Sequence, residues 1–533
     1  MTTGTPYKQA TLAEVWDAIV IGSGIGGLTA AVLLGAHADK RVLVLERHYE
    51  AGGFTHTFHR PGYEWDVGLH YIGQMQDKNS TVRRAFDHIT GGRVNWQSTP
   101  EVYDRFIIEG RRFDFTAGLE RFREGLGQSF PGETRAIDLY ISAVRACNRL
   151  SGLYYAEKAV PAPVAALVGG MMRLPYMRWA RRTTLEVLQS FTSNRELIGV
   201  LTGQWGDYGL PPAKSSFAAH ATIAGHYFDG ASYPAGGAGA IAAAIVPQIE
   251  DAGGMVVTSA EVSAIVLDCG RAAGVRMSDG REFRSGVILS DAGAANTFER
   301  LLPPDLSPLG ALRQRLRRLE PSTAHVSLYV GLSQSDAALA LQGTNLWVYP
   351  SFDHDANVER FVRDMDAALP DVYLSFPSAK DPDFQHRHPG KSTVEAITML
   401  PYAAFDRWAK TRWKHRGDEY DALKERLSAR LLAELERQVP SVVGNIAYTE
   451  SSTPLTTRDF MNYGHGEIYG IASTPERFQM RELGARTPIR GVYLTGQDAA
   501  SLGVVGALFG GVICASVACG KNLFPVVSKL RVA

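Results

Sequence analysis

Three glycines and one acid near the amino terminus have the types and spacing of a dinucleotide site. Gly22, Gly24 and Gly27 form a GxGxxG pattern with Ser23 inside it, and Glu46 lies 19 residues beyond Gly27. The first glycine of such a pattern permits a tight turn, the second admits a pyrophosphate and the third allows close packing of a helix on a strand. The acid accepts hydrogen bonds from ribose hydroxyls. The pattern therefore predicts binding of a nucleotide cofactor.

The segments around these residues have the order strand, helix, strand. Ala18–Ile21 is a short apolar run typical of a buried strand, Leu28–Leu34 is an Ala/Leu-rich helix, and Arg41–Leu45 is a second strand that ends at Glu46. The N-terminus of such a helix offers free N–H groups and a partial positive charge to phosphates. We therefore expect an α/β fold with a Rossmann-like domain.

The residues after Glu46 favour FAD over NAD. Gly52 and Gly53 follow the acid by six and seven residues. This Glu-x5-Gly-Gly continuation resembles the FAD-binding amine oxidase and phytoene desaturase superfamily. An acid at position 46 would also repel the 2′-phosphate of NADP.

A second glycine cluster, Gly237-x-Gly239-x-x-Ala242, resembles another fingerprint. Tyr233 and Pro234 precede it, and proline is unsuited to a central strand. We therefore interpret the cluster as a loop entering a helix, with a nicotinamide site as the alternative. The next elements are expected to be a helix over Ile241–Asp251, strands over Met255–Thr258, Val262–Leu267, Ala273–Met277 and Val287–Ser290, and a hairpin turn at Asp279–Gly280.

Near the carboxyl terminus, Ala499–Gly520 runs 22 residues without a charge. A membrane-spanning helix needs about 20 apolar residues, so the run could form either a membrane anchor or a helix buried in the protein. A short strand over Gly491–Leu494 and a turn over Thr495–Asp498 precede the run, and Asp498 is expected to cap the helix. This strand and turn before the run, together with small residues that recur every four positions within it, favour a buried helix that packs under a flavin.

The chain resembles the all-trans-retinol 13,14-reductase (retinol saturase) family, within the carotenoid isomerase and phytoene desaturase group. The similarity lies in AGGFTHTF with DVGLHYIG, SSFAAHATIAGHYFDGASYPAGG, LSFPSAKDP, SSTPLTTRDF and VYLTGQDAASLGVVGAL, spread over nearly the whole chain. It implies a glutathione-reductase/amine-oxidase type FAD-binding domain with an inserted α+β substrate domain. It also implies flavin-dependent saturation of one double bond in a conjugated polyene.

The resemblance assigns FAD to a defined set of residues. The acid at 498 is expected to hold the ribityl chain, and the backbone at 262 is expected to touch the adenine. Two departures concern the cation near the flavin, because Ala235 replaces an arginine of the family and Phe54 replaces a basic residue of the wider superfamily. The assigned residues are Gly22, Ser23, Gly24, Gly27, Glu46, Arg47, Gly52, Gly53, Thr55, Val262, Gly496, Asp498, Val504 and Val505.

Saturation requires a hydride on one carbon and a proton on its neighbour. The catalytic candidates are His70, Tyr71, His226 and Tyr227, from segments expected to border the flavin. A lone histidine in an apolar segment is more often a buried core residue, and aromatic side chains could equally line a polyene tunnel. This alternative applies to the further residues Trp205, Tyr208, His220 and Tyr233.

The fingerprints divide the chain of 533 residues into two discontinuous domains. We assign residues 1–80, 230–300 and 485–533 to the FAD-binding domain, and residues 81–229 and 301–484 to the substrate domain. The first part of the substrate domain is expected to be mostly helical. Within it, residues 159–179 are apolar with basic residues at the end, and their prolines should break a helix. We interpret this segment as a membrane contact, with a core-facing connection as the alternative.

The composition limits the classes of molecule that the protein is expected to bind. The formal net charge is zero, which gives no attraction to nucleic acid. Four cysteines without metal spacing and a polar N-terminus favour a cytoplasmic protein, with peripheral membrane contact. No metal site is expected, and His386-Arg387-His388 is interpreted as a solvated loop. The expected partners are a lipophilic substrate and an electron donor, either NADPH or an electron carrier. A carotenoid desaturase or isomerase, and a lipid carrier like the Rab GDP-dissociation inhibitors, remain alternatives.

Overall fold

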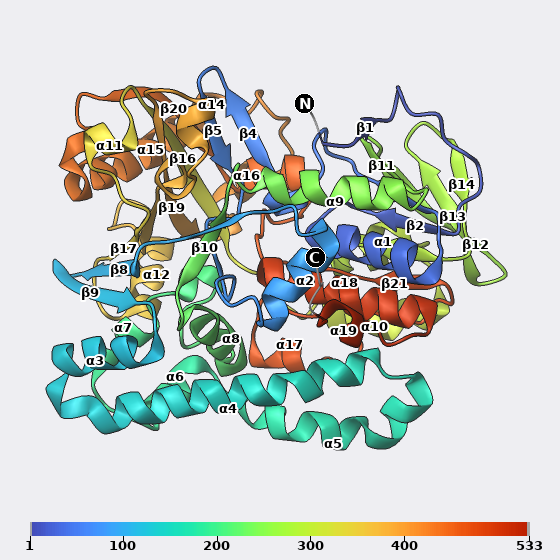
Figure 1. Cartoon of the computed structure of the whole chain (residues 1–533), viewed down its shortest axis with the longest axis horizontal. Coiled ribbons are helices and arrows are strands. Elements are labelled where there is room, and N and C mark those ends of the chain that lie inside the picture. Colours follow the sequence, from blue (N-terminus) through green and yellow to red (C-terminus); the bar gives the residue numbers. More distant parts are fainter. Residues whose placement is uncertain (1–2, 530–533) are drawn as a thin grey trace.

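A computed structural model describes residues 3–529, so residues 1–2 and 530–533 of the predicted terminal ranges lie outside it. A parallel six-stranded sheet occupies the right half of Figure 1. Its strands come from three distant parts of the chain and bring the two ends together. In sheet order they are β1 (Thr5–Pro6), β11 (Met255–Thr258), β3 (Val42–Leu45), β2 (Ala18–Ile21), β15 (Ile288–Ser290) and β21 (Val492–Leu494).

Three helices cover this sheet: α1 (Ile25–Ala38), α9 (Gly239–Asp251) and α18 (Gly503–Cys519). The long apolar run near the carboxyl terminus is α18, and it packs against α1. A Cβ at Gly511 would collide with the carbonyl oxygen of Gly26, and one at Gly510 would collide with that of Gly496. The small residues therefore let α18 approach two backbones closely, as the buried-helix interpretation expected. Within residues 3–529, no helix has the length and apolarity needed to cross a bilayer.

The second glycine cluster follows β10 (Ala231–Pro234), which lies outside the parallel sheet. The prediction that Tyr233 and Pro234 could not belong to a central strand is wrong, because β10 is the middle strand between β6 (Ile72–Gly73) and β7 (Trp96–Ser98). Pro234 is tolerated because it is the last residue of the strand and pairs only with Trp96. A separate meander contains β12 (Val262–Asp268), β13 (Arg271–Met277) and β14 (Glu282–Arg284).

A seven-stranded sheet forms the other half of the molecule (Figure 1). Its pairings are antiparallel except for the one between β17 and β8. The strands β16 and β19 are buried along their whole length. In sheet order the strands are β20 (Ile446–Ser452), β16 (Ala324–Leu332), β19 (Ser392–Leu400), β18 (Val372–Ser375), β17 (Asn345–Tyr349), β8 (Val102–Ile108) and β9 (Arg111–Thr116).

This sheet and the helix packed on it bear on two expectations. Residues 81–229 are mostly helical, as expected, and they also supply β7, β8 and β9. The charged stretch over residues 408–437, whose composition predicts a solvated helical face, contains α15 (Asp418–Gln438), and this helix also buries an apolar stripe that includes Leu423, Leu427 and Leu431. The hairpin β4 (Thr57–Arg60) and β5 (Tyr63–Asp66) also reaches this sheet, because Trp65 donates a hydrogen bond to the carbonyl of Val330.

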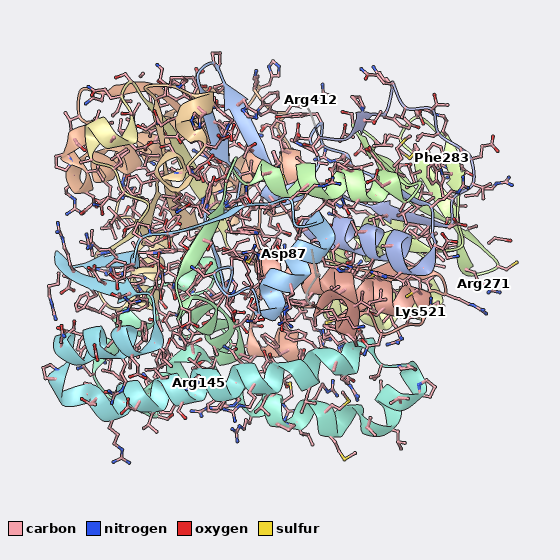
Figure 2. All side chains as sticks on the ribbon, in the orientation of Figure 1. Asp87, Arg145, Arg271, Phe283, Arg412 and Lys521 are labelled. Carbon is pink, nitrogen blue, oxygen red and sulfur yellow. The ribbon has the colours of Figure 1, made fainter. Side chains whose placement is uncertain are left out.

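A layer of helices lies along one side of both sheets: α3 (Leu119–Ser129), α4 (Thr134–Ala159), α5 (Ala162–Ala180), α6 (Thr184–Gln189), α7 (Arg195–Leu201) and α8 (Phe217–Tyr227). Figure 1 shows α4 and α5 as a long hairpin at the lower edge, and Figure 2 labels Arg145 on α4. The expectation that prolines break the helix over residues 159–179 holds at Val160 and Pro161, between α4 and α5, but not at Pro175. Pro161 precedes the first turn of α5, and Pro175 lies inside α5 without ending it.

Candidate active site

One continuous cavity of about 1400 Å³ reaches from the carboxyl ends of the parallel strands to the seven-stranded sheet. Gly22, Gly24, Glu46 and Asp498 line one end, and Trp347, Tyr373, Ile397 and Met399 line the other. Residues from both predicted domains therefore enclose the same space. A nucleotide cofactor and a second molecule can meet within it.

The glycine pattern has the backbone geometry that its spacing predicts. Gly22 has a φ of 97°, in the region that favours glycine. A Cβ at Gly24 would lie 2.5 Å from Oδ2 of Asp291, and a Cβ at Gly27 would lie 2.5 Å from the carbonyl oxygen of Gly22. Side chains are therefore excluded where the β2–α1 turn faces the cavity. This bare backbone fits a pyrophosphate.

Glu46 lies at the end of β3, and its carboxylate can accept one more hydrogen bond than it receives from the protein. Its Oε2 accepts hydrogen bonds from the backbone N–H of Ser23 at 2.8 Å and from Oγ of Ser23 at 2.7 Å. Its Oε1 accepts one from the backbone N–H of His48 at 2.7 Å. A carboxylate has about four acceptor positions, so Oε1 can still accept a ribose hydroxyl.

Two of the predicted cofactor residues do not line the cavity. Ser23 instead orients Glu46 and receives a hydrogen bond from the N–H of Gly52, and Gly27 packs on the turn. The guanidinium of Arg47 lines the cavity and donates to the carbonyl of Phe460 at 3.1 Å. The predicted residues that do line it are Gly22, Gly24, Glu46, Arg47, Gly52, Gly53, Thr55, Val262, Gly496, Asp498, Val504 and Val505.

Asp498 does not cap α18, which corrects the sequence prediction. The helix begins at Gly503, with Leu502 as its N-cap residue. The carboxylate of Asp498 instead accepts from the N–H of Ala294 at 2.8 Å and from that of Ile471 at 3.0 Å. The acid therefore joins three distant segments at the cavity wall, while the first turn of α18 presents Val504 and Val505 to the same cavity.

Asp291 is a residue of this wall that sequence reasoning missed. It follows β15 directly and sits against Gly22, Gly24 and Gly496. Burial raises the pKa of its carboxyl to about 8. The signal in the sequence is an acid that follows a parallel strand, at the edge where the fingerprint turn also lies.

All four catalytic candidates line the second half of the cavity. The two histidines favour the neutral form there, so neither holds the extra proton that a general acid would donate. Burial lowers the pKa of His70 to about 3 and that of His226 to about 4. Nε2 of His226 accepts a hydrogen bond from the backbone N–H of Gly73 at 2.8 Å, which places the proton of the neutral ring on Nδ1.

Tyr71 has the richest polar surroundings of the four candidates. Its hydroxyl lies 3.0 Å from Oδ2 of Asp104 and 2.7 Å from Oδ2 of Asp207. Its ring stacks on that of Tyr227, with the centroids 4.4 Å apart. Burial raises the pKa of Tyr71 well above its ordinary value. Sequence reasoning missed Asp104 and Asp207, although Asp207 is the only charged residue of the stretch over residues 201–210.

The remaining aromatic and histidine candidates lie outside the cavity lining. Both ring nitrogens of His220 are occupied, Nε2 by the hydroxyl of Tyr140 at 3.0 Å and Nδ1 by that of Tyr208 at 3.1 Å. His220 is therefore a satisfied core histidine. Trp205 is fully buried, and Tyr233 donates its hydroxyl hydrogen to Asp66.

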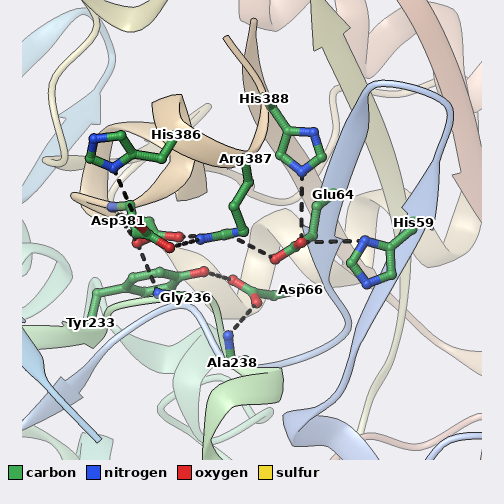
Figure 3. A network of polar contacts seen from close by, with 11 residues as sticks. His59, Glu64, Asp66, Tyr233, Gly236, Ala238, Asp381, His386, Arg387 and His388 are labelled. Carbon is green, nitrogen blue, oxygen red and sulfur yellow. Dashed lines mark hydrogen bonds and ion pairs between the residues drawn. The ribbon is translucent and has the colours of Figure 1, made fainter. Parts of the chain in front are cut away.

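The His386-Arg387-His388 segment belongs to an ionic network that supports the loop over residues 233–237 (Figure 3). Arg387 bridges Asp381 at 2.8 Å and Glu64 at 3.2 Å. Oδ1 of Asp381 accepts from the N–H of Gly236 in the loop at 2.9 Å. Over residues 3–529, no cluster of three or more histidine, cysteine or acidic side chains is arranged to hold a metal ion.

The fold and the site define an oxidoreductase with a Rossmann-like domain for a flavin-type dinucleotide. The family described as NAD(P)-binding Rossmann-like domain matches residues 20–89. An oxidoreductase structure from Methanosarcina mazei aligns with a TM-score of 0.60 at 18% identity, covering 93% of this chain and 98% of that chain.

Two relatives are similar over nearly the whole length. The all-trans-retinol 13,14-reductase of Danio rerio is 36% identical, covering 97% of this chain and 88% of the relative. The chloroplastic prolycopene isomerase of Arabidopsis thaliana is 26% identical, over 94% and 82%. The chain belongs to the all-trans-retinol 13,14-reductase family, and the resemblance drawn from its motifs is confirmed.

Proposed function

We propose that this protein is an FAD-dependent oxidoreductase that saturates one carbon–carbon double bond of a hydrophobic conjugated polyene, of retinoid or carotenoid type. The observation that carries this proposal is the single cavity with a dinucleotide cradle at one end and an aromatic chamber at the other. A flavin bound in the cradle supplies a hydride. The cavity walls hold the polyene against it and exclude water.

The residues of the cradle fit FAD. Gly22 and Gly24 leave room for the pyrophosphate, Oε1 of Glu46 accepts from the ribose, and the backbone of Val262 borders the adenine. The wall around Asp498 takes the ribityl chain. The N–H groups of the first turn of α18, near Val504 and Val505, carry partial positive charge toward the isoalloxazine.

Among the catalytic candidates, Tyr71 is the group best placed to handle a proton. His70, His226 and Tyr227 shape the chamber, because the histidines favour their neutral forms and the ring of Tyr227 supports that of Tyr71. The electron donor is NADPH or an electron carrier that reaches the same cavity. The proposal that the donor uses the same cavity is supported by the second glycine cluster, which follows a strand outside the parallel sheet and so lacks the setting of a second nucleotide site.

The α4–α5 hairpin is proposed to rest on a bilayer. Four apolar side chains recur at helical spacing on α5 and are exposed: Val164 (44%), Leu167 (83%), Met171 (68%) and Leu174 (61%). The cavity lining includes Ala159, Val160 and Pro161 at the junction of the two helices. A lipophilic substrate could thus pass from the membrane interface into the cavity without crossing water.

The direct test is anaerobic incubation of the reduced enzyme with retinoid and carotenoid polyenes, followed by the mass of the product. A gain of two hydrogens supports saturation. A loss of two hydrogens supports desaturation, and an unchanged mass with altered geometry supports isomerisation, which the similarity to prolycopene isomerase makes the second candidate. A purified protein without flavin absorption would favour a lipid carrier instead.

A further inference from the structure

The hydroxyl of Tyr71 touches two carboxylates but has only one hydrogen to donate. Oδ2 of Asp104 lies at 3.0 Å and Oδ2 of Asp207 at 2.7 Å. If both acids were ionised, one of them would face the lone pairs of the phenol oxygen at hydrogen-bond distance, which is repulsive. The arrangement is satisfied when one acid carries a proton and donates it to Tyr71, while Tyr71 donates to the other.

Asp104 is the acid that is held as the anion. Besides Tyr71, it accepts from Nε2 of Gln204 at 2.8 Å and from Nδ2 of Asn345 at 3.0 Å. The ammonium of Lys380 binds Oδ1 of Asn345 and thereby turns the amide nitrogen of Asn345 toward Asp104. Burial raises the pKa of Asp104 above its ordinary value, and the hydrogen bonds from Asn345, Gln204 and Tyr71 act against that rise. Donors of this kind stabilise the charged form of a carboxyl group, and Asp104 has more of them than Asp207.

Asp207 lacks this support. Within the described part of the chain, its side chain has one hydrogen bond, to Tyr71. It keeps some accessible surface and lines the cavity. Burial, followed by the charge of Asp104, raises the pKa of its carboxyl to about 8. The proton of the pair therefore resides on Asp207 at neutral pH.

The other titratable groups around Asp207 do not change this assignment. Burial raises the pKa of each surrounding phenol well above its ordinary value, so the phenols stay neutral; they belong to Tyr71, Tyr208, Tyr227, Tyr349, Tyr373 and Tyr469. Lys380, on α13 (Pro377–Lys380), has its pKa lowered by burial to about 8. Lys380 and Asp207 therefore titrate in the same range.

We propose that Asp207 is the proton reservoir of the reaction and that it delivers its proton to the substrate through the hydroxyl of Tyr71. This rests on the proposed saturation of a polyene. The hydride from the reduced flavin forms one C–H bond. As the second C–H bond forms, the Tyr71 hydroxyl turns from Asp104 toward the substrate and releases its proton, while the O–H bond of Asp207 breaks and restores the phenol. Asp207 is left ionised and regains a proton from water that enters the cavity after product release.

A spectroscopic test asks whether Asp207 carries a proton, whatever the substrate. The infrared carbonyl band of protonated carboxyl groups is compared between the wild type and Asp207→Asn, in the FAD-loaded protein, across pH 6–10. We expect the difference spectrum to contain a band that disappears near pH 8. Asp371→Asn is the matched control: this acid is also buried with its pKa raised to about 8, but it lies outside the cavity lining, so its substitution should remove a band of its own and leave the band of Asp207 in place. A wild-type spectrum that loses nothing on substitution of Asp207 would overturn the assignment.

A kinetic test asks whether the proton passes through Tyr71. With reduced enzyme and a polyene that the wild type saturates, Tyr71→Phe should slow the saturation about 10²–10⁴-fold at unchanged flavin content. The wild-type rate should fall as pH rises through about 8, because Asp207 loses its proton there. Asp207→Asn should lower the rate and remove this alkaline limb, and Asp207→Glu should restore it. A limb that persists in Asp207→Asn would assign it to Lys380 and overturn the proposal.

Further outcomes separate the possible failures. If Tyr71→Phe keeps the wild-type rate while Asp207→Asn does not, the acid acts directly and the route through Tyr71 is wrong. If the wild type saturates no polyene, the proposed function fails, and the infrared band still decides the protonation of Asp207. If Asp207→Asn does not retain flavin, the infrared comparison is made with Asp207→Glu, which should shift the carbonyl band, and the activity of Tyr71→Phe and Asp207→Glu decides the route of the proton.

Discussion

Glu46 combines two tasks in one side chain. Three of its acceptor positions hold Ser23 and the backbone of His48, which connects the fingerprint turn to the end of β3. The remaining position on Oε1 is free for a ribose hydroxyl. The residue therefore shapes the cradle, and in the proposed complex it would also recognise the ribose.

Replacing Glu46 with arginine should abolish retention of FAD. The change removes the ribose acceptor and also releases the two segments that the carboxylate holds together. The measurement is the ratio of flavin to protein absorbance after purification. Glu250→Arg makes the same change of charge at an exposed position on α9 and should remain yellow. A yellow Glu46→Arg protein would contradict the assigned site.

Two helices connect the site to the rest of the molecule by opposite means. α18 has small residues on the face that approaches α1, so that backbone meets backbone at the cradle. α5 instead leaves most of an apolar stripe exposed. The first arrangement stabilises the cofactor site, and the second leaves an uncompensated apolar surface.

Enlarging Gly511 should damage the cradle. In Gly511→Val, the new side chain meets the carbonyl oxygen of Gly26 and the side chain of Thr29, so α18 must move away from α1. We expect a lower thermal unfolding midpoint and loss of flavin. Gly170→Val adds the same atoms to α5, where a Cβ meets nothing within 4 Å, and should retain flavin. Equal midpoints for the two variants would disprove this packing role.

Removing the exposed stripe of α5 should weaken membrane binding without affecting the cofactor. Burying one leucine side chain contributes about 1.5–3 kcal/mol, so Leu167→Gln with Leu174→Gln should lower partitioning into liposomes by about tenfold or more. Val362→Gln with Val443→Gln changes two other exposed apolar residues and serves as the control. Flotation that does not differ between the two double variants would refute the contact.

At the scale of the whole molecule, the fold buries histidines in their neutral form. Burial lowers the pKa of His220 to about 3 and those of His226, His325 and His354 to about 4. Their contribution to stability is complete above the unfolded value near 6.5, and it is lost as pH falls toward the folded pKa values. The protein should therefore lose stability steeply between pH 6 and pH 4.

His220 allows this acid sensitivity to be measured. Each such group contributes about 1.4 kcal/mol per pH unit within the window. His220→Gln should therefore flatten the fall of the unfolding midpoint between pH 6 and pH 4, even if it lowers the midpoint at pH 7. His386→Gln, at a side chain that is 83% exposed, should leave the slope unchanged. If His220→Gln leaves the fall of the unfolding midpoint between pH 6 and pH 4 unchanged, the His220 ring is not buried in its neutral form.

The sequence by itself determined the cofactor half of this protein. The GxGxxG turn, its strands and Glu46 lie within 30 residues, so short-range spacing specifies their geometry. The strand-and-turn entry to the apolar tail run likewise indicated a buried helix. Predictions that depended on the propensity of one residue were wrong. Pro234 lies in β10, Pro175 lies inside α5, and Asp498 accepts hydrogen bonds from Ala294 and Ile471 instead of capping α18. In each case the surrounding tertiary structure overrode the local preference.

The tertiary structure alone decided the polar centre of the chamber. Tyr71, Asp104, Asp207, Asn345 and Lys380 come from five separate segments, and none has a neighbour in sequence that reveals its partner. In the sequence, Asp104 is one of two charged residues in a short strand, Asp207 is a single acid in a turn, and Lys380 is one residue of the motif LSFPSAKDP. Only the packing of β8, β17 and α13 around one cavity brings them to hydrogen-bond distance, and the desolvation that follows sets which of them carries the proton.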